Sequence, residues 1–426
     1  MSGALNLIYV NTDSVGYGRY GLKLAEALER RGIKVLPSLE PGKPLAHVAA
    51  WVATPPHVRR WYTGQYTVLS TMWEGTVLPE AFRENLHDFD LVVVPSEHNA
   101  ELFSKYHPNV KRVWLGVDTE QWKPLERAVP TDRFVYLIGG SGKRKGTDLA
   151  YRAFKKVFKT WPAGHPTPYL VMKSPRSEDY YGERIERVGG RITTQAELDL
   201  YGLAHCYLQP SRGEGWGLQP LQAMATGMPT ILTDGHGHHE FAHLGIPIKH
   251  GWAKSEYFIH GDAGDWWEPD FDELCERMWD VYSNYELHLE RAKKSAGVVA
   301  RVFSWDRCAA RFIDAVGEER FQQPYDGNFV AKVPNPRLFL VRVQKPWAAW
   351  VANIFHQWVP GKDYYEIADV KRVLFDAEVL DSSCIIGSEE QMGLSAKQVA
   401  AMGDYSGRHS YCWTCGQKLG TGELQI

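Results

Sequence analysis

One glycine-rich stretch places a single carboxylate at the point where a helix begins. Glu214 stands between Gly213 and Gly215, a run with helical spacing follows, and a short apolar segment ends near Ile231. Backbone N–H groups are unpaired in the first turn of a helix and the helix dipole is positive there, so such a junction suits a phosphate or a hydroxyl-rich ligand. The pattern predicts a ligand-binding loop with Glu214 beside the ligand.

Two further loops contain glycines directly after predicted strands. One covers residues 11–21 and opens the first predicted helix, and the other covers residues 139–148 and contains three consecutive basic residues. Glycines let the backbone approach a phosphate group closely, and basic side chains balance its negative charge. The candidate contact residues in these two loops are Gly16, Gly18, Gly140, Lys143, Arg144 and Lys145.

The stretch from Ser211 to Pro229 resembles the sugar-nucleotide loop of the retaining GT-B glycosyltransferases, glycosyltransferase family 4. This resemblance implies that Glu214 lies near the donor sugar and that a second acidic residue, eight positions later, binds the ribose. The second position here is Gln222, whose amide can still hydrogen-bond a diol. Because eight residues are close to two helical turns, we expect both side chains on one helix face. The further donor contacts implied within this stretch are Gly215, Trp216, Gly217 and Leu218.

The resemblance also implies roles for the basic loop. Family members carry an arginine just after the strand and a lysine immediately before a glycine, and together these neutralise the leaving diphosphate. Lys145 matches the lysine, whereas the arginine position is glycine, so Lys143 or Arg144 would supply the second charge. In the family the donor phosphate helps to take the proton from the acceptor, the anomeric configuration is retained, and catalysis requires no metal.

Three histidines follow the next predicted strand, within residues 233–241. Their position matches a family loop that faces the donor sugar, so we interpret Gly237, His238 and Glu240 as donor contacts rather than as part of a zinc site. In the first half of the chain, Glu74 and His57 follow predicted strands. Either side chain is a candidate for orienting the acceptor hydroxyl, and His57 is equally consistent with an ordinary surface histidine.

A zinc site is one of two interpretations of the C-terminal cysteines. Cys412 and Cys415 stand two residues apart, which is the spacing of a zinc half-site, and His409 with Cys384 would complete a tetrahedral set. The alternative is that these cysteines are free thiols.

Composition limits the class of protein. A chain of 426 residues with 44% hydrophobic residues is too long for one core. Its six dispersed cysteines favour reduced thiols, and a formal net charge of −3 gives no overall reason to expect nucleic acid. Because no run of about 18 apolar residues and no basic segment before an apolar one is visible, we expect a cytoplasmic protein without a membrane span.

Short apolar runs alternate with amphipathic helices along residues 5–318, which predicts an α/β protein with parallel sheets. The resemblance implies the GT-B architecture, two facing Rossmann-like domains with the ligand at the carboxyl ends of their strands. We assign residues 1–120 to the acceptor domain, 121–305 to the nucleotide-sugar domain, 306–320 to a helix returning to the first domain, and 321–426 to a small α+β accessory module. The expected strands are Leu7–Val10, Thr67–Ser70, Leu91–Val94, Phe134–Ile138, Tyr169–Met172, Cys206–Leu208, Thr230–Leu232 and Leu338–Val343. The expected helices are Tyr20–Arg31, a helix capped by Ser96 and ending at Tyr106, two helices within Asp270–Val302, and one after Trp305.

These features predict an enzyme that moves a sugar from a nucleotide diphosphate sugar to an acceptor hydroxyl. The acceptor stays open between a modified base in DNA, a protein and a glycan, and so does the oligomeric state. Aromatic and basic residues are interleaved in the C-terminal region, as a surface that presents a polymer would require. They are Arg337, Arg342, Lys345, Trp347, Trp350, Phe355 and Trp358. Two alternatives are a sugar-binding or assembly protein on the same scaffold and a sugar-nucleotide epimerase.

Overall fold

The computed structural model describes residues 3–9, 16–39, 44–58, 62–140, 142–173, 180–190, 192–256 and 261–327, and the backbones of four short strands beyond them. The described residues fall into two compact units. The first contains Met1–Thr71, Ala81–Val92 and the chain from Val316 onward, and the second contains Met72–Glu80 and Val93–Ala315. No helix in these ranges is long and apolar enough to cross a membrane.

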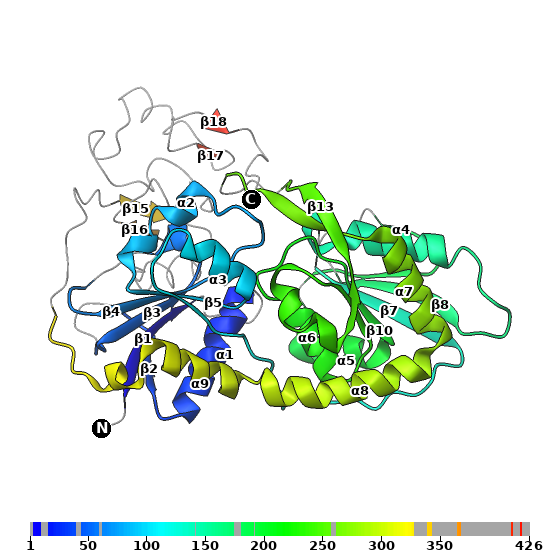
Figure 1. Cartoon of the computed structure of the whole chain (residues 1–426), viewed down its shortest axis with the longest axis horizontal. Coiled ribbons are helices and arrows are strands. Elements are labelled where there is room, and N and C mark those ends of the chain that lie inside the picture. Colours follow the sequence, from blue (N-terminus) through cyan, green and yellow to red (C-terminus); the bar gives the residue numbers. More distant parts are fainter. Residues whose placement is uncertain are drawn as a thin grey trace. The chain divides into compact units, whose positions relative to one another are not determined.

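The first sheet has six strands in the order β2-β1-β3-β4-β5-β6 (Figure 1). β1 pairs in parallel with β2 and β3, and β3 pairs in parallel with β4. Every residue of β3 is buried, as expected for an inner strand of a sheet covered on both faces. The strands are β1 (Ala4–Tyr9), β2 (Lys34–Leu36), β3 (Val48–Val52), β4 (Tyr66–Ser70), β5 (Leu91–Val94) and β6 (Val110–Arg112).

Helix α1 (Gly16–Arg30) packs on β1 of this sheet. Tyr20, Leu24 and Leu28 recur at helical spacing and are buried. A Cβ at Gly21 would lie 2.3 Å from the side chain of Tyr9, so glycine permits the close approach of helix and strand. The short helices nearby are η1 (Pro55–His57), α2 (Glu80–Arg83) and η2 (Leu86–Asp88), and α3 (Glu97–Ser104) follows β5.

The second sheet has the order β12-β11-β10-β7-β8-β9, and all five of its pairings are parallel. Its strands are β7 (Arg133–Gly139), β8 (Thr167–Lys173), β9 (Ile185–Val188), β10 (Cys206–Gln209), β11 (Thr230–Thr233) and β12 (Ile246–Ile248). The carboxyl ends of these strands lie at one edge, and each leads into a loop or helix. Such an edge is where open α/β sheets bind their ligands.

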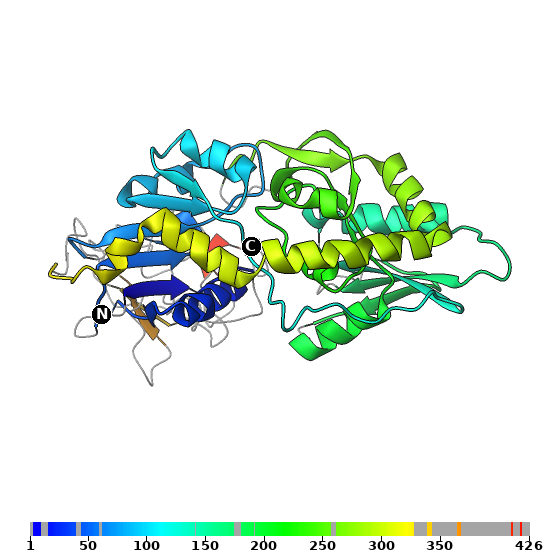
Figure 2. The same cartoon turned by 60° about the horizontal axis from the view of Figure 1, so that its bottom comes forward.

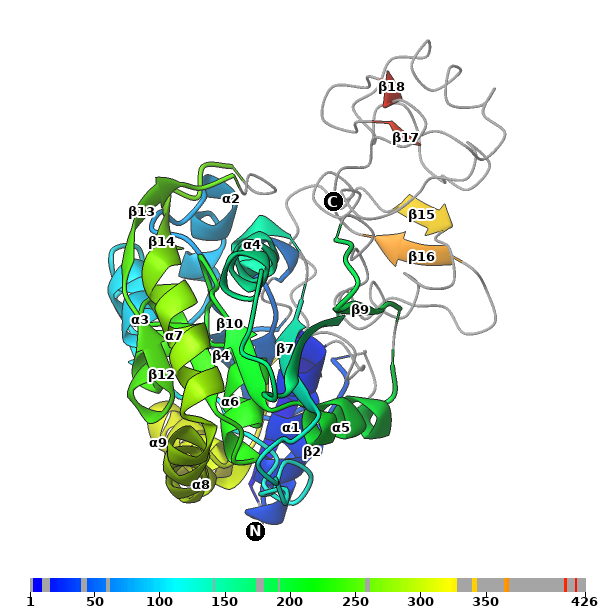
Figure 3. The ribbon, with the colours of Figure 1, turned by 90° about the vertical axis from the view of Figure 1, so that its right-hand side faces the viewer.

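Helices cover both faces of the second sheet (Figure 3). α4 (Thr147–Val157) and α7 (Phe271–Ser283) share one apolar core with the side chains of β7 that face them, whereas α5 (Thr194–Leu203) and α6 (Leu218–Ala225) pack on the opposite face. α8 (Tyr285–Val302) packs on α6 and α7. A two-stranded antiparallel hairpin, β13 (His250–Lys254) with β14 (Asp265–Pro269), completes this unit with the short helices η3 (Lys143–Lys145), η5 (His236–Glu240) and η6 (Ala242–Leu244).

The segment around Val117 meets the chain between the end of α8 and the start of α9 (Trp305–Val316) (Figure 2). Val117 forms a parallel bridge with Ser304, and its N–H donates to the carbonyl oxygen of Phe303 at 2.6 Å. A Cβ at Gly116 would lie 2.4 Å from the backbone nitrogen of Trp305, so only glycine fits this crossing. The final described turn is η7 (Glu318–Gln322), which packs on β1.

The α/β class with two Rossmann-like parallel sheets is confirmed, and the expected strands of the two domains are present. One boundary is wrong. The first helix begins at Gly16 rather than at Tyr20, which places Gly16 and Gly18 inside the helix. The strands β2, β3, β6, β9 and β12 and the β13–β14 hairpin were not predicted. In the C-terminal region, β15 (Phe339–Arg342), β16 (Tyr364–Ile367), β17 (Ser410–Tyr411) and β18 (Lys418–Leu419) are described, and the remainder of the expected accessory module lies outside the described residues.

Candidate active site

The loop between β10 and α6 is buried along most of its length and fits closely against neighbouring backbone. A Cβ at Gly213 would lie 2.1 Å from the carbonyl oxygen of Glu74, and one at Gly215 would lie 2.5 Å from the side chain of Met72. Gly217 has φ 109°, and a Cβ there would lie 2.5 Å from the imidazole of His238. These three glycines are therefore required by space, and at Gly217 also by backbone conformation.

Glu214 is the buried carboxylate of this loop, with 6% of its surface exposed. Lys145 Nζ donates to its Oε1 at 2.5 Å, Ser211 Oγ donates to the same oxygen at 3.0 Å, and Arg144 Nη1 lies 3.4 Å from Oε2. The two cations come from η3, so the turn after β7 and the loop after β10 meet at one carboxylate. The structure thus brings together three residues that the sequence analysis assigned separately to donor binding.

The charge state of Glu214 follows from these neighbours. Burial alone raises its pKa, but Lys145 and Arg144 outweigh burial, and the net pKa lies well below the usual range of a carboxyl. Burial lowers the pKa of Lys145, and the adjacent carboxylate opposes that shift. At neutral pH the site therefore holds an ionised carboxylate clamped by cations, which can accept hydrogen bonds and cannot donate a proton.

Two neutral imidazoles border the carboxylate. His238 is fully buried, and its Nε2, which faces Gly217, has no hydrogen-bond partner among the described residues. Burial lowers its pKa to about 4. His236 adopts φ 44°, and burial lowers its pKa well below the ordinary value, while its Nε2 lies 3.0 Å from the carbonyl oxygen of Ser211. Neutral rings at this position can hydrogen-bond hydroxyl groups without adding positive charge.

A buried arginine, Arg212, anchors the loop to neighbouring elements. The guanidinium of Arg212 donates to both carboxylate oxygens of Asp148 in α4, at 2.7 and 3.0 Å, and to Glu268 in β14 at 2.9 Å. Its backbone N–H also donates to the carbonyl oxygen of Arg144 at 2.7 Å. This bidentate arrangement ties the loop to both α4 and the hairpin, so Arg212 is a positioning residue.

Two residues predicted as donor contacts, Glu240 and Trp216, contact other parts of the protein. Glu240 accepts a hydrogen bond from the backbone N–H of Glu97 at 2.6 Å and lies 3.5 Å from Arg112, so its carboxylate caps α3. Trp216 is almost fully buried against Phe241 and Phe303, which makes it a core residue of the loop.

The expected shared helix face of Glu214 and Gln222 is wrong. α6 begins at Leu218, four residues after Glu214, so helical spacing does not relate the two side chains. Gln222 itself lies within α6 and is 3% exposed.

The remaining predicted residues have different surroundings, and only some of them contact the Glu214 loop. Glu74 is part-exposed, with its Oε1 3.8 Å from Arg144 Nη1, and Lys143 pairs with Glu256 at 2.8 Å on the surface. Gly140 has φ 96° and packs against Lys145, and the backbone of Gly237 donates to the carbonyl oxygen of Glu214 at 2.9 Å. Gly16 and Gly18 belong to the other compact unit, and residues 11–15 lie outside the described ranges, as does the side chain of His57.

Some residues near the site were missed because nothing in the local sequence marks them. Ser211, Arg212 and His236 contact the cluster from within the expected stretches, but Asp148 and Glu268 reach it from a helix and a hairpin. His98 lies 4.6 Å, ring to ring, from Trp267 and 3.1 Å from the carbonyl oxygen of Gly75, and burial lowers its pKa to about 4. The one available signal was a histidine two residues after the helix cap at Ser96.

In the described part of the chain, no group of three or more histidine, cysteine, aspartate or glutamate side chains is placed to hold a metal ion. The described cysteines, Cys206, Cys275 and Cys308, are buried free thiols. The predicted zinc ligands Cys412, Cys415, His409 and Cys384 lie outside the described residues, so that site stays a prediction.

Comparison with known proteins gives relatives for this chain. A family model described as family 4 glycosyltransferase in conflict systems matches residues 96–312. The putative glycosyltransferase 41 of Sulfolobus islandicus filamentous virus is 26% identical over 226 residues, which are 52% of this chain and 60% of that protein. The lipopolysaccharide core biosynthesis mannosyltransferase LpsB of Rhizobium meliloti is 32% identical over 139 residues, which are 28% of this chain and 39% of that protein. Both matches span less than two thirds of the relative.

Solved structures share the fold. A sucrose-phosphate synthase from Thermosynechococcus elongatus has a TM-score of 0.56 at 15% identity, over 75% of this chain and 100% of that one. A glycosyltransferase from Rickettsia africae has a TM-score of 0.52 at 11% identity, over 75% and 99%. Anabaena HepE in complex with UDP-glucose has a TM-score of 0.50 at 14% identity, over 74% and 99%. At these identities the likeness establishes the GT-B type of fold.

Proposed function

Because this chain belongs to the family 4 glycosyltransferases of conflict systems, we propose that it transfers a sugar from a nucleotide diphosphate sugar to an acceptor hydroxyl with retention of anomeric configuration. One observation carries the proposal. Glu214, a buried and ionised carboxylate, lies in the loop four residues before α6 begins, with Lys145 and Arg144 against it. A carboxylate, two cations and the start of a helix close by together match the hydroxyls and the diphosphate of a sugar donor.

Glu214 has the role of a hydrogen-bond acceptor for the donor sugar. Its lowered pKa keeps it ionised, so it can bind sugar hydroxyls and is unsuited to protonate a leaving group. The pairing with two cations also makes it a poor nucleophile. We therefore propose that the leaving phosphate of the donor accepts the proton of the acceptor hydroxyl. This step is consistent with retention of configuration without a covalent intermediate on the protein.

Lys145 and Arg144 have the role of stabilising the diphosphate. One N–H of the Lys145 ammonium is directed at Glu214, and an ammonium has two more donors. Negative charge on the diphosphate grows as the glycosidic bond breaks, so a fixed cation there interacts more strongly with the transition state than with the bound donor. Glu74, which lies near Arg144, is our candidate for orienting the acceptor hydroxyl.

The neutral imidazole of His238 supports the sugar side of this assignment. Its unpartnered Nε2 faces Gly217, one position before α6 begins, where a hydroxyl-bearing ligand would provide the missing hydrogen bond. A protonated ring would instead add a third cation beside Glu214. The pKa of about 4 keeps the ring neutral over the range in which the enzyme would act.

The test is a donor screen with the full chain. The protein is incubated with UDP, GDP and ADP sugars, and release of the nucleoside diphosphate is measured without acceptor and with candidate DNA, protein and glycan acceptors. We expect slow hydrolysis of donors with one base and faster release with the right acceptor. Proton NMR of the product then reads the anomeric configuration. Inversion would refute the retaining mechanism, and tight donor binding without any release would favour a binding protein. Conversion of the donor to a stereoisomer would favour an epimerase.

A further inference from the structure

We propose that a second site, at the edge of the second sheet opposite Glu214, binds a small phosphate, either inorganic phosphate or a phosphomonoester. β11 begins at Thr230 beside this site and ends at Thr233, from which the chain continues to His236 and the candidate active site. Because the strands of this sheet are parallel, the two sites lie at opposite ends of the same strands.

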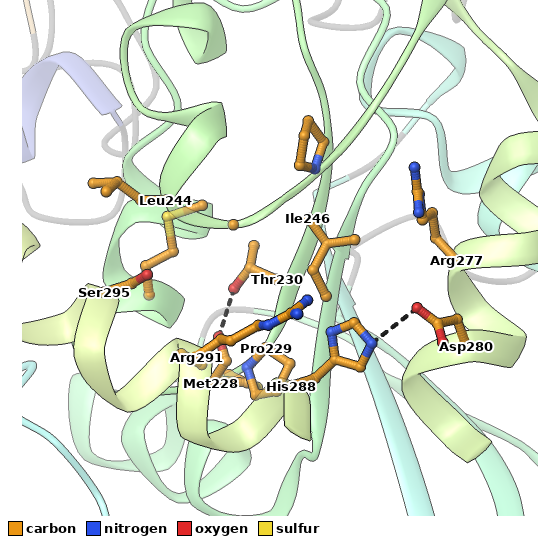
Figure 4. A pocket seen from close by; sticks show the side chains of 14 residues that line it. Met228, Pro229, Thr230, Leu244, Ile246, Arg277, Asp280, His288, Arg291 and Ser295 are labelled. Carbon is orange, nitrogen blue, oxygen red and sulfur yellow. Dashed lines mark hydrogen bonds and ion pairs between the residues drawn. The ribbon is translucent and has the colours of Figure 1, made fainter. Parts of the chain in front are cut away.

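The site is a cavity of about 210 Å³ between α6, η6, β12, α7 and α8 (Figure 4). One part of its wall is apolar and comes mainly from Met224, Met228, Leu244 and Ile246. The other part is formed by two helices, with Arg277 and Asp280 on α7 and with His288, Arg291 and Ser295 on α8. The wall therefore combines a cationic side with an apolar side.

His288 supplies a polar atom that lacks a partner. Its side chain is 5% exposed, its Nε2 lies 2.9 Å from Asp280 Oδ2, and its Nδ1 has no hydrogen-bond partner among the described residues. A buried polar atom without a protein partner calls for a water, an ion or a ligand as its partner. The ring donates from Nε2 to Asp280, so a neutral ring would accept a hydrogen bond at Nδ1 and a charged ring would donate one. Phosphate titrates near neutral pH and can satisfy either state.

Two guanidinium groups supply the charge. Arg291 follows His288 by three residues on α8, which places both on one side of the helix, as Figure 4 shows. Arg291 is exposed, and no hydrogen bond or ion pair joins it to any residue that the structure describes. Arg277 donates to Glu273 at 2.9 Å, while its Nε is buried without a partner. Asp280 is the one carboxylate of the lining and already contacts His288, so the guanidinium of Arg291 and the Nε of Arg277 are left to bind an anion.

The volume selects a ligand smaller than a sugar nucleotide. Sites for drug-sized ligands measure roughly 300–1,000 Å³, and this cavity falls below that range. A phosphate group matches the fork of an arginine, and the apolar wall can accept a short carbon substituent. The cavity is therefore distinct from the donor site in both place and size.

The experiment is calorimetric titration of the full chain with inorganic phosphate and with phenyl phosphate. We expect saturable binding with a Kd below about 1 mM, because a few charge-assisted hydrogen bonds supply the binding free energy of such an affinity. Stronger binding of phenyl phosphate would identify an ester ligand, and equal or stronger binding of inorganic phosphate would identify the free ion. Arg291→Gln should weaken binding at least tenfold, and His288→Asn should weaken it as well.

Lys293→Gln is the matched control, since Lys293 lies on the same helix, is exposed and pairs with Glu290. It should leave phosphate binding unchanged, and saturating UDP should not displace the phosphate. If Arg291→Gln fails to fold, Arg277→Gln serves as the second variant. The proposal is overturned if neither probe binds, if the arginine variants bind as the parent does, or if UDP competes.

Discussion

Replacement of Lys145 by alanine should lower kcat for donor cleavage far more than it raises the donor KM. Lys145 is the closest cation to Glu214, with Nζ 2.5 Å from Oε1, and 23% of its side chain is exposed. A comparable fixed charge or donor at a site of developing charge contributes about 2–4 kcal/mol to the transition state. At 1.36 kcal/mol for each factor of ten, this predicts a roughly 30- to 1,000-fold loss of kcat.

The assay is steady-state release of nucleoside diphosphate, with kcat and KM determined separately. Lys143→Ala is the matched control, because Lys143 lies in the same short helix η3 but is 60% exposed and pairs with Glu256. Its kcat should stay near that of the parent. Arg144 and Ser211 still contact Glu214 in the Lys145 variant, so the fold should persist. An increase in KM alone would refute the reasoning and would make Lys145 a ground-state anchor, with Arg144 the better candidate.

Three further predictions concern the loop, the imidazoles and the C-terminal region. Gly217→Ala should destabilise the protein by about 1–3 kcal/mol in urea unfolding, because φ 109° and the imidazole of His238 both oppose a side chain; Gly251→Ala, where a Cβ meets nothing within 4 Å, should have no comparable effect. His98 and His238 have pKa values of about 4 in the folded protein and near 6.5 when unfolded, so the unfolded chain binds more protons between these values and stability should fall as pH drops from 6.5 toward 4. Urea midpoints at pH 5 and pH 7 test this, and a His238→Asn variant that keeps the full pH dependence would contradict a share for His238. Removal of the residues after Gly327 should preserve donor binding and slow hydrolysis while abolishing transfer to a polymer; full transfer by a soluble truncated protein would contradict a role for that region in acceptor delivery. The cut follows Gly327 because a cut at residue 320 would remove Phe321, which is 2% exposed beside Gly3.

The loop around Glu214 could be predicted from the sequence because its signals are local. Glycines, a carboxylate and a helix start occur within a few residues, and Lys145 stands directly before Gly146, whose Cβ would lie 1.8 Å from the carbonyl oxygen of Pro210. The steric requirement for glycine in the structure therefore coincides with the pattern that marked the loop. The strands were predictable for a similar reason, since buried parallel strands are continuous apolar runs.

The parts that could not be predicted depend on contacts between distant segments. Arg212 binds Asp148 and Glu268, which lie 64 and 56 residues away, and no spacing rule relates such positions. Glu240 followed a family pattern, yet its carboxylate caps α3, a contact across 143 residues. The expected shared face of Glu214 and Gln222 failed because the helix begins only after the loop has turned.

The central claim is that Glu214 performs donor chemistry, and one comparison tests it most directly. Release of nucleoside diphosphate is measured for the parent and for Glu214→Ala with the donor identified in the screen, while circular dichroism monitors the fold. The account predicts that the variant folds as the parent does and loses sugar transfer. Unchanged turnover by a folded Glu214→Ala protein would contradict it.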